Sequence, residues 1–375
     1  KPNKQLQLQQ NSFKKPIYIN LSNIRTGGSI QVAMSFIDHV LASEFKSNFY
    51  FLFSARLMKE MKKSHLASFL DQLRNRKINR LSLFFLISIL QPKKIFTLFG
   101  PLYALKLTRN RDWITGFAQP WILYPNNKVY DELNKITWLR YKIMFWIQKL
   151  LYYNSHTLIV EHQGVKAMLK NHIKNKNIIV AKNCLNQIFL KPKSWKLIDI
   201  ADNKKLKIGV IGRNYIHKNM KILPAVHNAL LQNHGIIPQF YCTLTSEEMI
   251  KMDNEFKAKV ISVGELAIDQ CPDFYNKMDI IFFPSNLECF SATPLEALFM
   301  KKSIVCSNLP FNKNIIGKFG TYFEPNNSVS AAEKIVTILK TQTDKKLDEA
   351  KDFVFSTFKS EDRFRIYINT ILKNE

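Results

Sequence analysis

The chain has 375 residues, of which 46% are hydrophobic, and a formal net charge of +26 at pH 7. This length exceeds what one hydrophobic core organises and suits two domains. The apolar content excludes a disordered protein. No stretch approaches the roughly 18 uninterrupted apolar residues of a membrane-spanning helix, so we expect a protein that is not integral to a bilayer.

Most of the positive charge belongs to residues 1–190. Such asymmetry predicts a polyanionic partner for the first half, either a membrane surface or a nucleic acid. Residues 1–15 are polar and basic without an apolar segment, so they are interpreted as a disordered basic tail and not as a signal peptide.

The cysteines are odd in number, scattered, and free of any C-x-x-C spacing. This pattern favours a reducing compartment and argues against a zinc site. The five residues are Cys184, Cys242, Cys271, Cys289 and Cys306.

Strand and helix patterns alternate along the chain, which predicts parallel sheets flanked by helices. In the first half we expect a strand over 17–20, a helix over 29–44, a strand over 49–53, a basic helix-rich region over 56–111, and strands over 113–115, 157–160 and 178–180. In the second half we expect a polar connector over 191–205, strands over 207–211, 239–243, 260–263, 280–283 and 303–306, and a terminal helix over 359–372.

A pair of carboxylates eight residues apart brackets one predicted strand-to-helix turn. Glu288 lies in the loop after the apolar strand, and Glu296 lies one turn inside the following helix. Both can face a crevice at the carboxyl end of a parallel sheet, where open α/β folds bind ligands. The alternative is a solvated Glu288 and a Glu296 that is favoured in the first helical turn by the macrodipole.

A second motif follows the strand over 207–211. Gly212 allows close approach of a ligand to the backbone, and Arg213 and Lys218 lie five residues apart before a helix. A guanidinium fork and a point charge together suit a diphosphate, although each residue alone is more often a solvated surface charge.

Together these motifs resemble the retaining GT-B glycosyltransferases of family 4, glycosyl transferases group 1. The resemblance rests on Gly212-Arg213-x4-Lys218-Asn219 and on Glu288-x7-Glu296 with the sequence that follows, and it extends from about residue 205 to 325. Upstream, Gly27-Gly28 and the segment 115–121 look like members that build bacterial surface polysaccharide, such as O-antigen or capsule.

The resemblance implies an α/β fold with two Rossmann-like domains facing across a cleft. The expected domains are an N-terminal acceptor domain over 16–190, completed by a C-terminal helix over 359–375, and a nucleotide-sugar-binding domain over 191–358. By resemblance, Glu288 contacts hydroxyls of the donor sugar and Glu296 accepts hydrogen bonds from the ribose.

Basic side chains and a helix start replace a metal in this class, so Arg213 and Lys218 are expected to hold the diphosphate. Further donor-side candidates are the residues near the start of the helix and in the base pocket, although core packing is the stronger expectation for Leu295. These candidates are Ser291, Ala292, Thr293, Leu295 and Val263.

The first half offers fewer candidates. Gly27 and Gly28 let the backbone approach the diphosphate or form an ordinary tight turn. Many family members carry a histidine near the transferred sugar; here Gln119 stands where we look for it, and His162 is the nearest alternative. The chemistry stays open at this point, because the leaving phosphate can itself take the acceptor proton.

Two segments, 56–111 and 137–153, mix Lys and Arg with large apolar residues. Such composition suits helices at an anionic membrane interface; the alternative is packing in the first domain with solvated basic faces.

The sequence thus predicts a retaining, metal-independent transferase without a cofactor, which takes its sugar from a UDP- or GDP-linked donor. The expected acceptor is a polyprenyl-diphosphate-linked or other glycan, and the expected location is cytoplasmic, peripheral on the inner face of the cytoplasmic membrane. Two alternatives remain. One is a GT-B relative with altered chemistry, such as a nucleotide-sugar epimerase or inactive scaffold. The other is a basic nucleic-acid-binding protein, although no nucleic-acid module is recognised and no nucleic acid is expected.

Overall fold

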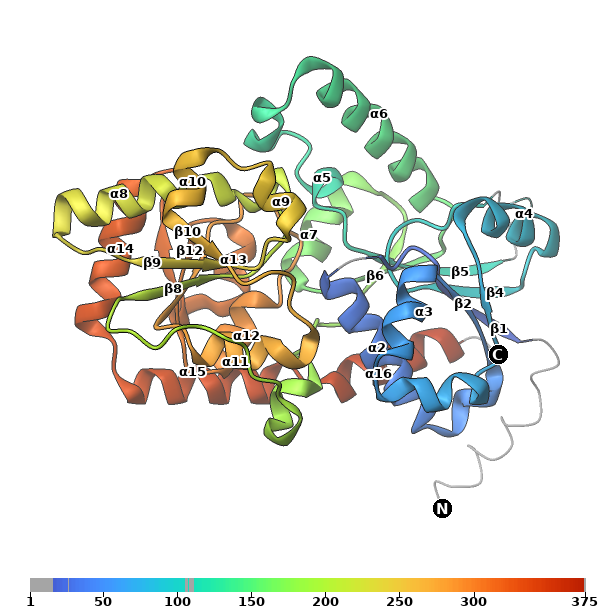
Figure 1. Cartoon of the computed structure of the whole chain (residues 1–375). Helices are drawn as coiled ribbons and strands as arrows, with labels where there is room; N and C mark the ends of the chain where they lie inside the picture. Colours follow the sequence, from blue (N-terminus) through green and yellow to red (C-terminus); the bar gives the residue numbers. More distant parts are fainter. Residues whose placement is uncertain (1–15, 26, 105–106, 108–110, 374–375) are drawn as a thin grey trace.

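The computed structural model describes residues 16–25, 27–104, 107 and 111–373, which form two lobes, each built around a parallel sheet (Figure 1). The expected basic tail over 1–15 lies outside the described residues.

A seven-stranded parallel sheet with the order β3-β2-β1-β4-β5-β6-β7 forms the core of the N-terminal lobe. Its strands are β1 (Ile17–Leu21), β2 (Phe49–Phe53), β3 (Asn75–Lys77), β4 (Lys94–Thr97), β5 (Asp112–Phe117), β6 (Thr157–Val160) and β7 (Asn177–Val180). The α-helices of this lobe are α2 (Gly27–Leu41), α3 (Ala55–Lys62), α4 (Arg80–Leu90), α5 (Pro120–Leu123), α6 (Lys135–Tyr152) and α7 (Gln163–His172).

A six-stranded parallel sheet with the order β10-β9-β8-β11-β12-β13 forms the C-terminal lobe. Its strands are β8 (Lys207–Val210), β9 (Gln239–Cys242), β10 (Val260–Ser262), β11 (Ile280–Phe283), β12 (Ser303–Ser307) and β13 (Thr321–Phe323). The α-helices that follow are α8 (Leu223–His234), α9 (Ser246–Ile250), α10 (Asn254–Lys259), α11 (Cys271–Asn276), α12 (Thr293–Phe299), α13 (Pro310–Ile316), α14 (Ser328–Thr341), α15 (Asp344–Thr357) and α16 (Ser360–Leu372).

The sequence prediction of a helix-rich segment over 56–111 is wrong in part, because this segment also contributes β3 and β4. Strand β4 is fully buried, yet it begins with Lys94. The Lys94 ammonium lies 3.8 Å from a carboxylate oxygen of Asp112 and donates to the carbonyl of Lys373 at 3.3 Å. These long-range partners permit a buried lysine in a strand, and a pattern-based prediction does not see them.

Two other elements differ from expectation. The helix predicted over 29–44 begins earlier, at Gly27, and ends earlier, at Leu41. Strand β13 was not predicted, because it has three residues and lies at the edge of its sheet, where little apolar pattern is required.

The last helix, α16, joins the core of the N-terminal lobe, although it follows the C-terminal lobe in the chain (Figure 1). The ring of Phe36 on α2 lies 5.9 Å from that of Phe364 and 5.8 Å from that of Tyr367. In the opposite direction, Leu185 and Phe189 pack in the core of the C-terminal lobe. The chain therefore crosses between the lobes twice, and both crossings are fixed by buried apolar side chains.

Candidate functional site

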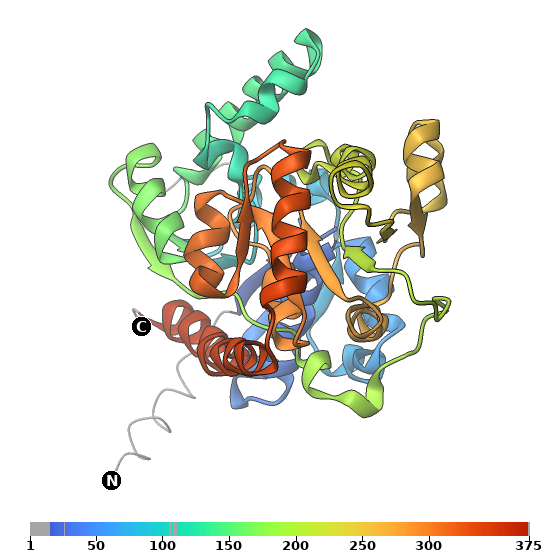
Figure 2. The same ribbon diagram turned by 90° about the vertical axis from the view of Figure 1, so that its left-hand side faces the viewer.

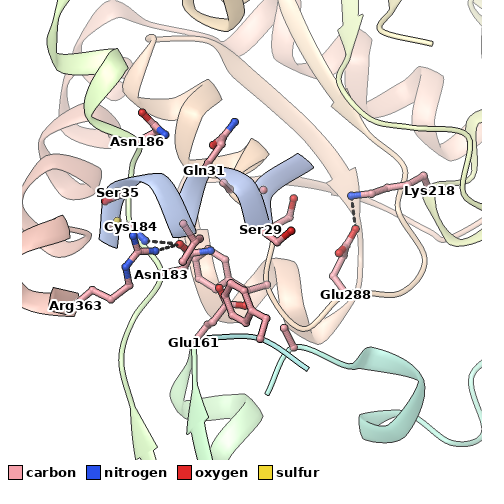
Figure 3. Close-up of a pocket in the computed structure, with 17 residues that line it drawn as sticks. Ser29, Gln31, Ser35, Glu161, Asn183, Cys184, Asn186, Lys218, Glu288 and Arg363 are labelled. Carbon is pink, nitrogen blue, oxygen red and sulfur yellow. Dashed lines mark hydrogen bonds and ion pairs between the residues drawn. The ribbon is translucent and has the colours of Figure 1, made fainter. Parts of the chain in front are cut away.

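A cavity of about 290 Å³ lies between the lobes. The N-terminal lobe contributes the first turns of α2 and the ends of β6 and β7, and the C-terminal lobe contributes residues from the loops after β8 and β11. The carboxyl ends of parallel strands from both sheets thus meet at one cavity, which is where open α/β sheets place ligands. Figure 3 shows the residues that line it.

Lys218 and Glu288 meet at the C-terminal side of this cavity (Figure 3). The Lys218 ammonium donates to Oε1 of Glu288 at 2.5 Å, and the hydroxyl of Ser285 donates to the same oxygen at 2.8 Å. The two side chains are 17% and 12% exposed, so the pair is shielded but open to the cavity. The sequence prediction that these two motifs share a site is consistent with this contact.

The loop that carries Lys218 is held by its neighbours. The hydroxyl of Thr243 donates to the carbonyl of Gly212 and accepts from its amide, both at 3.1 Å. A Cβ atom on Gly212 would lie 3.1 Å from the terminal methyl of Met220 and 3.8 Å from the Lys218 stem. Glycine at this position therefore avoids a tight contact with Met220, whereas the Lys218 stem would be at ordinary van der Waals distance.

Arg213 lies apart from this pair, and it is not among the residues that line the cavity. Its guanidinium contacts two carboxylates, with Nε 3.3 Å from Glu248 and a terminal nitrogen 3.3 Å from Glu265. The expected joint action of Arg213 and Lys218 on one diphosphate thus requires Arg213 to leave or share these partners, and it stays a prediction.

Glu296 is 4% exposed and accepts a hydrogen bond from the hydroxyl of Tyr275 at 2.7 Å. Burial raises the pKa of Glu296 to about 7, and the Tyr275 bond opposes this rise. Glu296 is not among the cavity residues, so the structure does not bring it to the same opening as Glu288. Its assigned contact with a ribose stays a prediction.

The remaining C-terminal candidates separate into two groups. Ser291 and Ala292 line the cavity at the start of α12. Leu295 is fully buried in the core, in agreement with the packing role expected for it, and Thr293 is 8% exposed. Val263 lines a different opening of about 470 Å³ beside Glu265.

The N-terminal end of α2 points at the Lys218–Glu288 pair (Figure 3). Gly27 has φ +48°, which favours glycine, and it begins the helix. Gly28 and Ser29 line the cavity, and a Cβ atom on either glycine would meet no atom within 4 Å. The glycine pair is therefore a helix start at the cavity and not a separate tight turn. Amides in the first turn of a helix favour an anion.

Neither acceptor-side candidate is among the cavity residues. Gln119 donates from its amide to the side-chain oxygen of Gln148 on α6 at 2.9 Å. His162 precedes α7, and its Nδ1 accepts from the amide of Gly164 at 3.0 Å. Burial is the main cause that lowers the pKa of His162. These contacts give both side chains structural partners.

Sequence reasoning missed several polar residues in the cavity wall, among them Glu161, Asn183 and Arg363. Arg363 on α16 donates to the side-chain oxygen of Asn183 at 2.7 Å, and both are buried. Glu161 directly follows the apolar strand β6, and an acid at the carboxyl end of a buried strand was a usable signal. Arg363 carries no comparable sequence signal, because it reaches the cavity only through the return of α16 to the N-terminal lobe.

Among the described residues, no group of three or more His, Cys, Asp or Glu side chains is arranged to hold a metal ion. None of the described helices is both long and apolar enough to span a membrane.

Two parallel-sheet lobes that face one another across a cavity, with the last helix returning to the first lobe, define the GT-B architecture. Residues 198–353 match the family model described as glycosyl transferases group 1. No curated protein sequence matches the chain significantly. The match lies within the C-terminal lobe, and together with the fold it makes the chain a glycosyltransferase of GT-B architecture.

Solved structures agree with this fold over nearly the whole chain. A glycosyltransferase from Rickettsia africae is 16% identical, with a TM-score of 0.63, covering 96% of this chain and 100% of its own. Sucrose-phosphate synthase from Thermosynechococcus elongatus is 14% identical, with a TM-score of 0.69 and coverage of 95% and 98%. HepE from Anabaena, solved with UDP and glucose, is 14% identical, with a TM-score of 0.63 and coverage of 95% and 99%. At these identities the likeness concerns the fold.

Proposed function

We propose that the chain transfers a sugar from a UDP- or GDP-linked donor to a glycan acceptor, with retention of anomeric configuration and without a metal ion or other cofactor. The observation that carries the proposal is the Lys218–Glu288 pair in the cavity between the lobes. A cation and a carboxylate side by side match the two chemical halves of a nucleotide sugar, its diphosphate and its hydroxyl-rich ring.

The leaving diphosphate requires positive charge around it. Lys218 supplies a point charge, and the first turn of α2 lies at the same cavity, where Ser291 and Ala292 also line the wall. Arg213 lies outside the cavity lining and can add a second cation if a phosphate competes for it with Glu248 and Glu265. Together these groups stabilise the negative charge of the leaving diphosphate, as a metal ion does in other transferases.

The sugar is assigned to Glu288 and the ribose to Glu296. A carboxylate grips vicinal hydroxyls by accepting two hydrogen bonds. Glu288 reaches this role when Lys218 turns toward the phosphate, whereas Glu296 reaches it by exchanging the hydroxyl of Tyr275 for those of the ribose. HepE was solved with UDP-glucose, which supports UDP as one of the two nucleotides to test first.

A lipid-linked acceptor at the cytoplasmic membrane is the finer part of the proposal, and α6 supports it. This helix projects from the N-terminal lobe in both views (Figures 1 and 2). Large apolar side chains on it are exposed at helical spacing: Ile136 83%, Leu139 53%, Ile143 51%, Trp146 61%, Ile147 45% and Leu150 47%. Exposed apolar rows of this size mark interaction sites. The basic residues of α6 make an anionic membrane surface the matching partner.

An opening of about 840 Å³ adds to this support. It lies between α5, α7 and the loops after β11 and β12, and its wall includes Leu123, Met168, Leu287 and Phe311. Leu287 in its wall directly precedes Glu288, which lines the cavity between the lobes. A space of this kind fits the hydrocarbon start of a polyprenyl carrier.

Calorimetry with UDP, GDP, ADP and CDP, in the presence of a chelator, tests the donor assignment. We expect UDP or GDP to bind and the corresponding nucleotide sugars to be hydrolysed slowly in the absence of an acceptor, with the released sugar's first anomer identified by NMR. Retention yields the donor's own anomer first. If none of the nucleotides binds, the proposal fails; if the product is an epimerised nucleotide sugar, the alternative of altered chemistry replaces it.

A further inference from the structure

Glu161 presents a buried carboxyl at the cavity between the lobes. It is 7% exposed and lines the cavity together with Lys218, Glu288 and Arg363 (Figure 3). Within the described residues, the structure shows no hydrogen bond or ion pair of this carboxyl group, because its cationic neighbours Lys218 and Arg363 bind Glu288 and Asn183 instead. A buried polar group without a protein partner is costly, so a carboxyl that is aimed into a ligand cavity indicates a partner that arrives with the ligand.

The charges around Glu161 come from several elements. Arg363 of α16 lies on one side and Glu288 of the C-terminal lobe on the other, while Lys218 lines the same cavity. Further titratable groups that interact with Glu161 are Cys184, Cys289 and Tyr367. Arg363 is itself held by Asn183, and Lys218 is held by Glu288. Both cations therefore have other partners, and neither forms an ion pair with Glu161 in the described part of the chain.

These surroundings favour the uncharged form of Glu161. Burial is the largest cause, and the nearby Glu288 adds to it, so that the pKa of Glu161 rises to about 8 despite the opposing effect of Arg363. A carboxyl near a second carboxylate in a low-dielectric site is the usual arrangement for keeping one of the two protonated. Neutral Glu161 has an O–H donor and a carbonyl acceptor; ionised Glu161 has acceptors alone.

We propose that Glu161 contacts the bound donor as a neutral carboxyl, donating a hydrogen bond to an anionic oxygen of its diphosphate. The inference rests on the proposed function, since it takes a nucleoside diphosphate as the occupant of the cavity. An ionised Glu161 would repel this occupant at close range, whereas the neutral form adds a donor to those of Lys218 and the start of α2. Donor binding is therefore coupled to the protonation of this one side chain.

The coupling has a measurable sign. A phosphate next to Glu161 makes ionisation still less favourable, so the bound state holds the proton at pH values where the free protein has released it. At pH values above the midpoint of Glu161 ionisation in the unbound protein, the affinity for UDP or GDP falls by about tenfold per pH unit. In this range, binding takes up a proton from the buffer.

The test is calorimetry of UDP and GDP with the full chain from pH 6 to pH 9, in buffers of different ionisation enthalpy. The wild type is expected to lose affinity above pH 8 and to take up close to one proton there. Glu161→Gln keeps a neutral donor of the same shape, so it should bind as well as the wild type at pH 6.5, keep its affinity at pH 9, and take up no proton. Glu333→Gln, an exposed change on α14, is the matched control and should behave as the wild type.

Three results would overturn the inference, and each is separable from failure of the proposed function. Equal pH profiles for the wild type and Glu161→Gln would show that Glu161 does not carry the coupled proton. A large loss of affinity in Glu161→Gln at pH 6.5, with unchanged thermal unfolding, would show that the ionised form is the one that binds. Loss of the proton uptake in Glu333→Gln would show that the effect is not specific. Absence of UDP and GDP binding by the wild type at every pH would instead remove the proposed function itself.

Discussion

The Nζ atom of Lys218 lies 2.5 Å from Oε1 of Glu288 and so ties the loop after β8 to the loop after β11. A main-chain bond reinforces this link, because the amide of Asn286 donates to the carbonyl of His217 at 2.7 Å. The cation and the carboxylate neutralise one another in this cavity, which lowers the cost of burying each. A diphosphate and a sugar that arrive together can each take one member of the pair.

Replacement of Lys218 by Met keeps the apolar stem and removes the charge. Because hydrogen bonds to charged groups contribute about 1.5–3 kcal/mol, we expect UDP or GDP to bind roughly 10- to 100-fold more weakly. Calorimetry at pH 6.5 measures the change. Lys221→Met, three residues further along and exposed, is the control and should leave the affinity unaltered. An unchanged affinity in Lys218→Met would contradict the placement of the diphosphate in this cavity.

The two C-terminal motifs could be placed from sequence because each lies in a short loop between a buried strand and a helix. Parallel strands end at one edge of a sheet, so Lys218 and Glu288 meet although 70 residues separate them. The same reasoning could not place Arg213 and Glu296, because their orientation depends on Glu248, Glu265 and Tyr275. These partners carry no motif of their own.

The N-terminal wall of the cavity was less predictable. The position of Gln119 and His162 in the chain favours a role near the acceptor, but their side chains form hydrogen bonds with Gln148 and with the amide of Gly164. Glu161, the neighbour of His162, points to the other side of the same strand end and lines the cavity. Successive residues at the end of a strand face opposite ways, and which of the two faces the ligand is decided by how the lobes meet.

Glu161 and Glu296 should make the protein less stable as the pH rises. The ordinary pKa of a Glu side chain is 4.5. Burial raises the pKa of Glu161 to about 8 and that of Glu296 to about 7. Each folded-state value lies above the unfolded one, so the associated stability is present below pH 4.5 and is lost as the pH rises toward 8.

Denaturant unfolding at pH 6 and pH 8.5 measures this loss. Glu161→Gln cannot ionise, so its free energy of unfolding should decrease less between the two pH values than that of the wild type, by about one to a few kcal/mol. The Glu161→Gln, Glu296→Gln double variant should show a smaller decrease still. Parallel decreases in all three proteins would mean that neither carboxyl has a raised pKa.

The exposed face of α6 should bind anionic membranes. We expect the protein to sediment with vesicles that contain phosphatidylglycerol, to stay in solution with zwitterionic vesicles, and to be released at 1 M salt, where the Debye length falls to about 3 Å. Ile143→Ser combined with Trp146→Ser should weaken the binding by about tenfold or more, because two large apolar side chains are removed from the interface. The control, Leu197→Ser with Ile250→Ser, removes two apolar side chains from the C-terminal lobe that are even more exposed than Ile143 and Trp146. Equal partition to both kinds of vesicle, or equal weakening in both variants, would exclude α6 as the anionic-membrane site.

Tyr367 on α16 should be required for the stability of the N-terminal lobe. It is 2% exposed, and its ring lies 5.8 Å from that of Phe36 and 5.3 Å from that of Phe96. Tyr367→Ala leaves a cavity between α16, α2 and β4, which costs about 3–5 kcal/mol. Tyr367→Phe keeps the ring, so it should lose about 1 kcal/mol or less.

The same helix carries Arg363, which lines the cavity between the lobes, so a loosened α16 should also weaken UDP or GDP binding at temperatures where the fold persists. Chemical unfolding and calorimetry on both variants measure these effects, and an alanine variant as stable as the phenylalanine variant would show that the last helix is not needed to complete the first lobe.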